Sequence, residues 1–398
     1  MGRSPKVEVE PTILRWARES AGVETATAAR RAGATPARIE EWEQGISSPT
    51  IKQLRKLGKA YMCSIGLFFL SELPEDPESI RDFRKIPDEL REEMSPALRF
   101  EIRLAWDRRD EALELMADLD EEPARIEGHF SIADDPDQVA AKLRRMLNIP
   151  VLEQQRWRDR YEAFNSWRQA IEGKGVLVFQ TGILRNLTVH PEEARGFSIA
   201  EQPYPVIVVT GKDHPTARCF TLIHELTHIL VDEGGICQDF AHRFGRATSQ
   251  IDRTEVFCNR VAASTLVPSD ALLRSDVVRG HARRVEWSDA ELGALARSFW
   301  VSWEVILRRL LTLGRTSKDF YQRWRQEKRD LFPGGETTSG SRVPILIPMP
   351  RRVVIKNGEL FPALVLRALR NGRITCARAA DILWAGPDRL RDIEMAIF

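Results

Sequence analysis

Residues 218–230 read Arg-Cys-Phe-Thr-Leu-Ile-His-Glu-Leu-Thr-His-Ile-Leu. The two histidines of this segment, His224 and His228, are four positions apart, so in a helix of about 3.6 residues per turn they lie on one face. The leucines and isoleucines around them recur at helical spacing and predict a buried helix that would hold both imidazoles rigidly. Two imidazoles placed in this way can bind a single metal ion.

Glu225 follows the first histidine directly and completes an H-E-x-x-H pattern. In zinc hydrolases with this pattern, the glutamate takes a proton from a water molecule without being a ligand itself. Such zinc sites need a third protein ligand and one open position. Metzincins have glycine and histidine at the positions that are Val231 and Gly234 here, so that class is excluded.

A second helical segment, predicted from Asp252 to Pro268, can supply the third ligand. Glu255 lies on one stripe of this helix, and the small residues near its end allow another helix to approach closely. A carboxylate at this place can complete a site of two histidines and one glutamate. The residues alone leave four other third ligands open, namely Asp232, Glu233, His242 and His214.

The segments RCFTLIHELTHIL and EVFCNRVAASTLVP together resemble the ImmA/IrrE family of bacterial zinc metallopeptidases. The chain departs from the family pattern at Cys258, where alanine is usual, and at Val261, where phenylalanine is usual. The resemblance implies a zincin-like (gluzincin-type) fold and Zn²⁺ as the cofactor. It also implies the roles of four side chains, with Glu225 as the general base and with the metal ligands His224, His228 and Glu255.

Residues 11–70 read as short helices separated by glycine-containing turns, and residues 34–61 resemble the Xre/Cro repressor family. The resemblance implies a helix-turn-helix domain whose helix from Thr35 to Trp42 enters the major groove of DNA. The contacts to nucleic acid would come from Arg30, Thr35, Arg38 and Lys52. Glu40 and Glu41 on the same helix disfavour a position near phosphate groups. The alternative is a helical bundle that serves protein contact or dimerisation.

Long amphipathic segments surround three short β-rich runs, at 176–179, 195–199 and 206–209. This pattern predicts a mainly α protein with a small β-sheet, of the α+β class, with a helical C-terminal region. An edge of such a sheet near residue 196 could hold an extended peptide. We expect an Xre-like domain at 1–72, a helical linker region at 73–150, a zincin-like core at 151–270, a helix-turn-helix-like extension at 271–332 and a small C-terminal α/β piece at 343–398.

The composition is ordinary for a globular protein, with 43% hydrophobic and 29% charged residues and a net charge of +1. No apolar run approaches the roughly 20 residues of a membrane helix, and the N-terminus lacks the apolar core of an export signal. The five scattered cysteines fit a reducing compartment better than a disulfide scaffold. These features predict a cytoplasmic protein of two or three domains that does not bind membranes, and an oligomer is compatible with them.

The family resemblance implies a zinc endopeptidase that cleaves a regulatory protein, often a repressor encoded by a neighbouring gene. Joined to a DNA-binding-type domain, it would act in transcriptional, stress or mobile-element regulation, with DNA as a further partner. Two alternatives remain open from the residues. The zinc fold could dock a partner without cleaving it, as in a transcriptional regulator or an antitoxin-like protein, or it could hydrolyse small amides.

Overall fold

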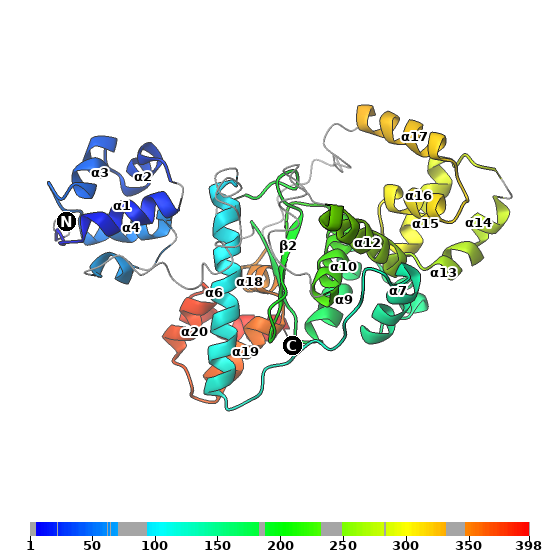
Figure 1. Cartoon of the computed structure of the whole chain (residues 1–398). Coiled ribbons are helices and arrows are strands. Elements are labelled where there is room, and N and C mark those ends of the chain that lie inside the picture. Colours follow the sequence, from blue (N-terminus) through cyan, green and yellow to red (C-terminus); the bar gives the residue numbers. More distant parts are fainter. Residues whose placement is uncertain are drawn as a thin grey trace. The chain divides into compact units, whose positions relative to one another are not determined.

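The computed structural model of the protein describes residues 5–21, 23–61, 63, 65–70, 94–182, 188–231, 249–281, 284–331 and 347–397. The chain forms two compact units, Met1–Asp107 and Arg108–Phe398, whose helices and strands are drawn in Figure 1. Helices predominate, and the described strands form one small sheet, so the protein is mainly α and of the α+β class as the sequence predicts. Residues 73–93 of the predicted helical linker region lie outside the described residues.

The first unit is a small helical bundle around its own hydrophobic core. Its elements are α1 (Pro11–Ser20), α2 (Thr25–Ala32), α3 (Pro36–Glu43), α4 (Ile51–Tyr61), the 3-10 helix η1 (Ile65–Phe69) and the first part of α6 (Pro96–Asp118). Gly33 ends α2 in the left-handed conformation at φ 70°, where a side chain would be strained. The Thr35 hydroxyl then accepts the Arg38 N–H and caps α3. Short-range signals therefore place both helices and the turn between them.

One buried ion pair connects the first and third helices of this unit. Arg18 on α1 donates from Nε and Nη2 to the two carboxylate oxygens of Glu43 on α3, at 2.7 and 2.9 Å. Glu43 is buried, and Arg15 donates to its backbone carbonyl at 2.9 Å. This bidentate ion pair has a specific geometry and thereby helps to fix the angle between α1 and α3.

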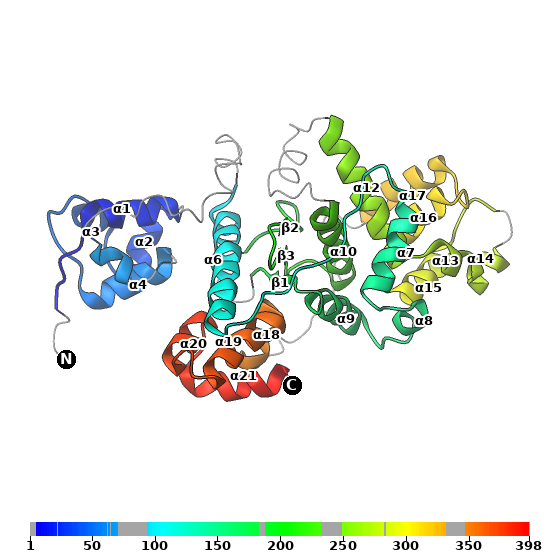
Figure 2. The same cartoon turned by 60° about the horizontal axis from the view of Figure 1, so that its bottom comes forward.

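The second unit contains the sheet, the central helices and the C-terminal helices (Figures 1 and 2). Its strands are β1 (Leu177–Gln180), β2 (Gly196–Ile199) and β3 (Val206–Val209). Within the described residues, no helix is both long enough and apolar enough to span a bilayer. After the part of α6 that begins at Arg108, the helices are α7 (Pro136–Met146), α8 (Val151–Gln154), α9 (Arg160–Glu172), α10 (Pro215–Val231), α12 (Ser249–Leu266), α13 (Ser269–Arg274), α14 (Asp276–Gly280), α15 (Asp289–Phe299), α16 (Trp303–Thr312), α17 (Lys318–Leu331), α18 (Met349–Asn357), α19 (Leu360–Arg370), α20 (Cys376–Ile382), η3 (Pro387–Arg389) and α21 (Leu390–Ile397).

The three strands form a sheet in the order β1-β3-β2, in which β1 is parallel and β2 antiparallel to β3. Every residue of the three strands is buried, so helices cover both faces of the sheet. Val178 belongs to the large core that contains α10. The next residue, Phe179, contacts Phe361 of α19 with ring centroids 5.7 Å apart. Because neighbouring side chains on a strand point to opposite faces, the sheet separates α10 from the C-terminal helices.

The described C-terminal residues, 347–397, contain helices and no strand, so the predicted α/β character of the 343–398 piece is wrong. The β-branched run Val353–Ile355, which suggests a strand, lies inside α18. Val353 and Lys356 of this helix are fully buried, and α18 packs on β1 and α21. Three β-branched residues express only a weak local preference, which this tertiary burial overrides.

Candidate metal centre

The site is built on α10, whose apolar residues fix it in the core. Leu222 and Leu226 are fully buried, and they hold the helix so that His224 and His228 share one face. The two imidazole rings have centroids 4.7 Å apart, and their Nε2 atoms are 3.0 Å apart. Phe220, one turn earlier, stacks on the His224 ring at a centroid distance of 6.3 Å. Helix packing therefore determines where both imidazoles point.

The third group comes from α12, which packs along α10. The Glu255 carboxylate lies 3.1 Å from Nε2 of His228 and 3.4 Å from Nε2 of His224. The three side chains are largely buried, and one possible ligand atom from each lies within 4.8 Å of the others. The structure thus brings together the two histidines of the H-E-x-x-H pattern and the glutamate that the family resemblance implies.

The distances among these atoms agree with tetrahedral metal coordination. Bonds of about 2.1 Å to nitrogen and oxygen place the ligand atoms of a tetrahedral ion roughly 3.4 Å apart, close to the separations of 3.0, 3.1 and 3.4 Å found here. Oε1 of Glu255 is buried and has no hydrogen-bond partner. Two imidazole nitrogens and a carboxylate that converge in this way fit a metal ion, and His-His-Glu is a common zinc ligand set.

Glu225 is held by a residue that sequence reasoning missed. Its side chain is almost completely buried, and its Oε2 accepts a hydrogen bond of 2.8 Å from the Ser198 hydroxyl on β2. Ser198 is buried as well, so this hydrogen bond forms in a low-dielectric environment. The only sequence signal is a hydroxyl in a strand that is otherwise buried and apolar. Nothing local indicates that this hydroxyl pairs with a glutamate on another element.

Gly196 on β2 lets the strand lie close to α10. A Cβ atom at this position would be 2.5 Å from Cγ2 of Thr221 and 2.7 Å from the Val208 carbonyl oxygen. Real Cβ atoms do not approach other atoms so closely, so glycine is required for this packing. The same approach brings Ser198, two residues further along the strand, within hydrogen-bond distance of Glu225.

Of the other possible third ligands, His214 is the one that the structure describes, and it does not join the cluster. His214 is engaged elsewhere, with its ring nitrogens 3.1 Å from Arg160 Nη1 and 2.8 Å from the Thr216 hydroxyl. Burial, and then the nearby Arg160 charge, lower the pKa of His214. Cys258, one turn from Glu255 on α12, is fully buried and is not part of the cluster. The remaining predicted alternatives, Asp232, Glu233 and His242, lie outside the described residues.

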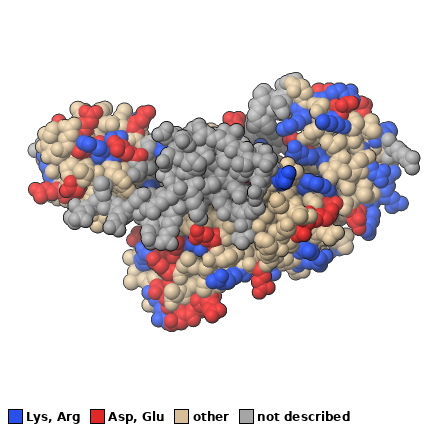
Figure 3. Space-filling model, viewed as in Figure 1, with Lys and Arg blue, Asp and Glu red and all other residues tan. Residues whose placement is uncertain are grey.

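The residues predicted to contact nucleic acid lie on α2 to α4 of the first unit. Arg30 is exposed at the end of α2 and donates to the Thr27 hydroxyl at 3.2 Å. Arg38, at the start of α3, forms an ion pair with Glu41. Thr35 serves as the cap of α3, and Lys52 is exposed on α4. Figure 3 shows acidic and basic side chains side by side on the visible face of this unit. These residues remain predicted contacts.

Residues 174–311 match the Peptidase M78 family model, described as the IrrE N-terminal-like domain. The matched range contains the sheet, α10 and α12, and therefore the whole metal cluster. This part of the chain is similar to a metallopeptidase family, in agreement with the ImmA/IrrE resemblance of its two key segments. The first unit lies outside the matched range. A comparison with curated proteins gave no match.

Proposed function

We propose that the protein is a zinc-dependent endopeptidase that cleaves a regulatory protein. The observation that supports this most strongly is the convergence of His224, His228 and Glu255 beside Glu225, within a range similar to a metallopeptidase family. Two histidines and a glutamate leave one coordination position of a four-coordinate zinc ion open for chemistry.

Zinc held by these three side chains would supply Lewis-acid chemistry and would make water acidic near neutral pH. Glu225 is then the general base, which accepts the proton of the attacking water and passes it to the leaving amine. Ser198 keeps one oxygen of Glu225 in a hydrogen bond. The other oxygen of the carboxylate thus has a defined direction, so Glu225 is already oriented for proton transfer before the substrate binds.

The sheet beside the site supports a protein as the substrate. In the described sheet, β2 is at one edge and packs directly on α10, the helix that carries His224 and His228. An extended polypeptide can add to such an edge through backbone hydrogen bonds, which favours a protein substrate over a small amide. We propose that the substrate is a repressor or a similar regulator, and that the first unit directs the enzyme to DNA or to the regulator itself.

The test uses the full-length protein and the product of each neighbouring regulatory gene. Wild-type protein with one equivalent of zinc should cleave one of these regulators in vitro. The Glu225→Gln variant should retain zinc and lose cleavage by at least 100-fold, because the general base is lost while the ligands remain. Regulation in cells that survives in the Glu225→Gln variant would instead show that docking, and not hydrolysis, is the function.

A further inference from the structure

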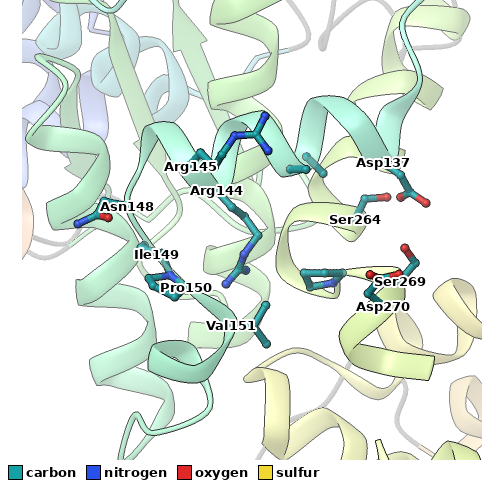
Figure 4. A pocket seen from close by; sticks show the side chains of 13 residues that line it. Asp137, Arg144, Arg145, Asn148, Ile149, Pro150, Val151, Ser264, Ser269 and Asp270 are labelled. Atoms are coloured by element: carbon teal, nitrogen blue, oxygen red, sulfur yellow. The ribbon is translucent and has the colours of Figure 1, made fainter. Parts of the chain in front are cut away.

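A second site lies on the far side of α12 from the metal cluster. A cavity of about 530 Å³ opens between α7, α8 and the junction of α12 with α13 (Figure 4). Its size falls in the usual range for small-molecule sites. Ser264 of α12 lines the cavity and comes nine positions after Glu255. At about 100° and 1.5 Å per residue, the two side chains lie on opposite faces of the helix and about 13 Å apart along its axis.

Arg144 of α7 is the buried charged group of this cavity. Only 8% of the residue is exposed. Its Nη1 donates to Oε1 of Gln154 and to the Thr265 carbonyl oxygen, both at 2.7 Å, and its guanidinium group lies 5.4 Å from the Trp167 ring centroid. These contacts hold the side chain in one orientation. In Figure 4 it extends into the space between Val151 and Ser264.

The acidic residue that favours the charged form of Arg144 is Glu153 of α8, and it acts from beyond ion-pair distance. Nη2 of Arg144 has no hydrogen-bond partner, and no carboxylate of the described chain forms an ion pair with it. Burial lowers the pKa of Arg144 to about 10, so the group stays charged at neutral pH. The α12 carbonyl and the tryptophan ring compensate a part of this charge. A buried cation without an anion in direct contact is nevertheless unfavourable.

The two acidic residues that line the cavity do not provide that partner. Asp137 pairs with Arg309 of α16, and Asp270 pairs with Arg274 of α13 at 2.7 Å. Arg145, the next residue on α7, is exposed and forms no ion pair within the described part of the chain. It points away from Arg144 in Figure 4. The lining therefore has two acidic and two basic side chains, and among these four Arg144 is the buried one.

We propose that this cavity binds a small organic carboxylate. The carboxylate would accept from Arg144, and the apolar part of the ligand would pack on the apolar wall formed by Ala140, Ile149, Pro150, Val151 and Pro268. A carboxylate fits better than inorganic phosphate, because one guanidinium group and an apolar wall cannot satisfy four oxygens. This site is independent of the proposed peptidase function.

The test measures binding to the full-length protein by isothermal titration calorimetry and by the shift of the melting temperature. The probes are hexanoate, hexanamide and inorganic phosphate, each up to 10 mM. Hexanoate should bind at least 10-fold more tightly than the other two, because only hexanoate combines a carboxylate with an apolar body. Equal binding of hexanamide, tighter binding of phosphate, or no binding of hexanoate would each overturn the proposal.

Three variants assign the binding to this cavity. Arg144→Met should weaken hexanoate binding at least 10-fold, but it also removes a hydrogen bond to the end of α12. Ala141→Leu is the second variant, because Ala141 is exposed, lines the cavity and leaves Arg144 intact. It should also weaken binding at least 10-fold by narrowing the cavity. The matched control, Lys142→Met, removes an exposed positive charge of α7 that does not line the cavity, and it should change binding less than 3-fold. Wild-type affinity in Ala141→Leu would contradict the proposal.

Discussion

Glu255 and Glu225 lie beside the same two histidines, but they are directed differently. Substitution of the two residues should therefore change the affinity for zinc to different extents. Glu255 contacts both Nε2 atoms, whereas Glu225 is directed to Ser198 on the sheet. We expect Glu255→Ala to lower zinc affinity by at least 100-fold, since a charged ligand is lost. Competition with a chromophoric chelator measures this affinity. Glu225→Ala serves as the control, and equal zinc loss in both variants would contradict the assignment.

The hydroxyl of Ser198 should matter for turnover and not for metal binding. Ser198→Ala frees the Glu225 carboxylate to adopt other orientations, so we expect kcat to fall about 10-fold while KM and zinc content stay unchanged. Thr227→Val is the matched control. The Thr227 hydroxyl is buried like that of Ser198, but it lies on α10 and donates to the Ile223 carbonyl at 2.7 Å. Steady-state kinetics on a cleaved substrate would measure both. A kcat loss as large in Thr227→Val would refute the role of Ser198.

At the scale of elements, the close contact between β2 and α10 depends on Gly196. Gly196→Ala forces its Cβ against Thr221 and the Val208 carbonyl, so we expect a loss of about 1–3 kcal/mol in the free energy of unfolding. Urea denaturation measures the change. Gly280→Ala at the end of α14 meets no atom within 4 Å and should not destabilise the protein. If Gly196→Ala left the free energy of unfolding unchanged, β2 would be able to shift away from α10, contrary to this prediction.

The elements that the sequence predicts correctly are those with short-range signals. Gly33 and Thr35 mark the turn between α2 and α3, and the histidine spacing with its apolar neighbours marks α10. The sequence fails where distant residues decide. Ser198 and Glu225 are 27 positions apart, and Arg144 contacts the Thr265 carbonyl 121 positions away. Such pairs depend on how whole elements pack, and a single sequence carries no local trace of them.

At the scale of the whole molecule, the C-terminal helices are attached to the sheet that supports the metal helix. Arg168 of α9 and Gln180 of β1 both donate to the Ile355 carbonyl of α18, at 3.0 and 2.8 Å. Glu172 accepts the Glu359 N–H next to α19 with both oxygens, at 3.2 and 3.1 Å. Polar contacts between residues more than 170 positions apart in the chain therefore hold the C-terminal helices against α9 and β1.

Glu172 makes this attachment sensitive to pH. Burial raises the pKa of Glu172 from 4.5 to about 7 in the folded protein. Between these values, the unfolded chain has released the proton and the folded protein still binds it, so stability falls as pH rises from about 4.5 to about 7. The shift corresponds to about 3 kcal/mol.

A neutral glutamine at position 172 removes this proton linkage while its amide oxygen can still accept the Glu359 N–H. We expect Glu172→Gln to unfold at higher urea than wild type at pH 8 and to show a flatter stability profile between pH 5 and pH 7. Urea denaturation at a series of pH values measures both. The control is Glu162→Gln, which changes a less buried carboxylate on the same helix. It should not alter the slope of stability against pH between pH 5 and pH 7. If the Glu172→Gln profile kept the wild-type slope, another group would have to control this pH range.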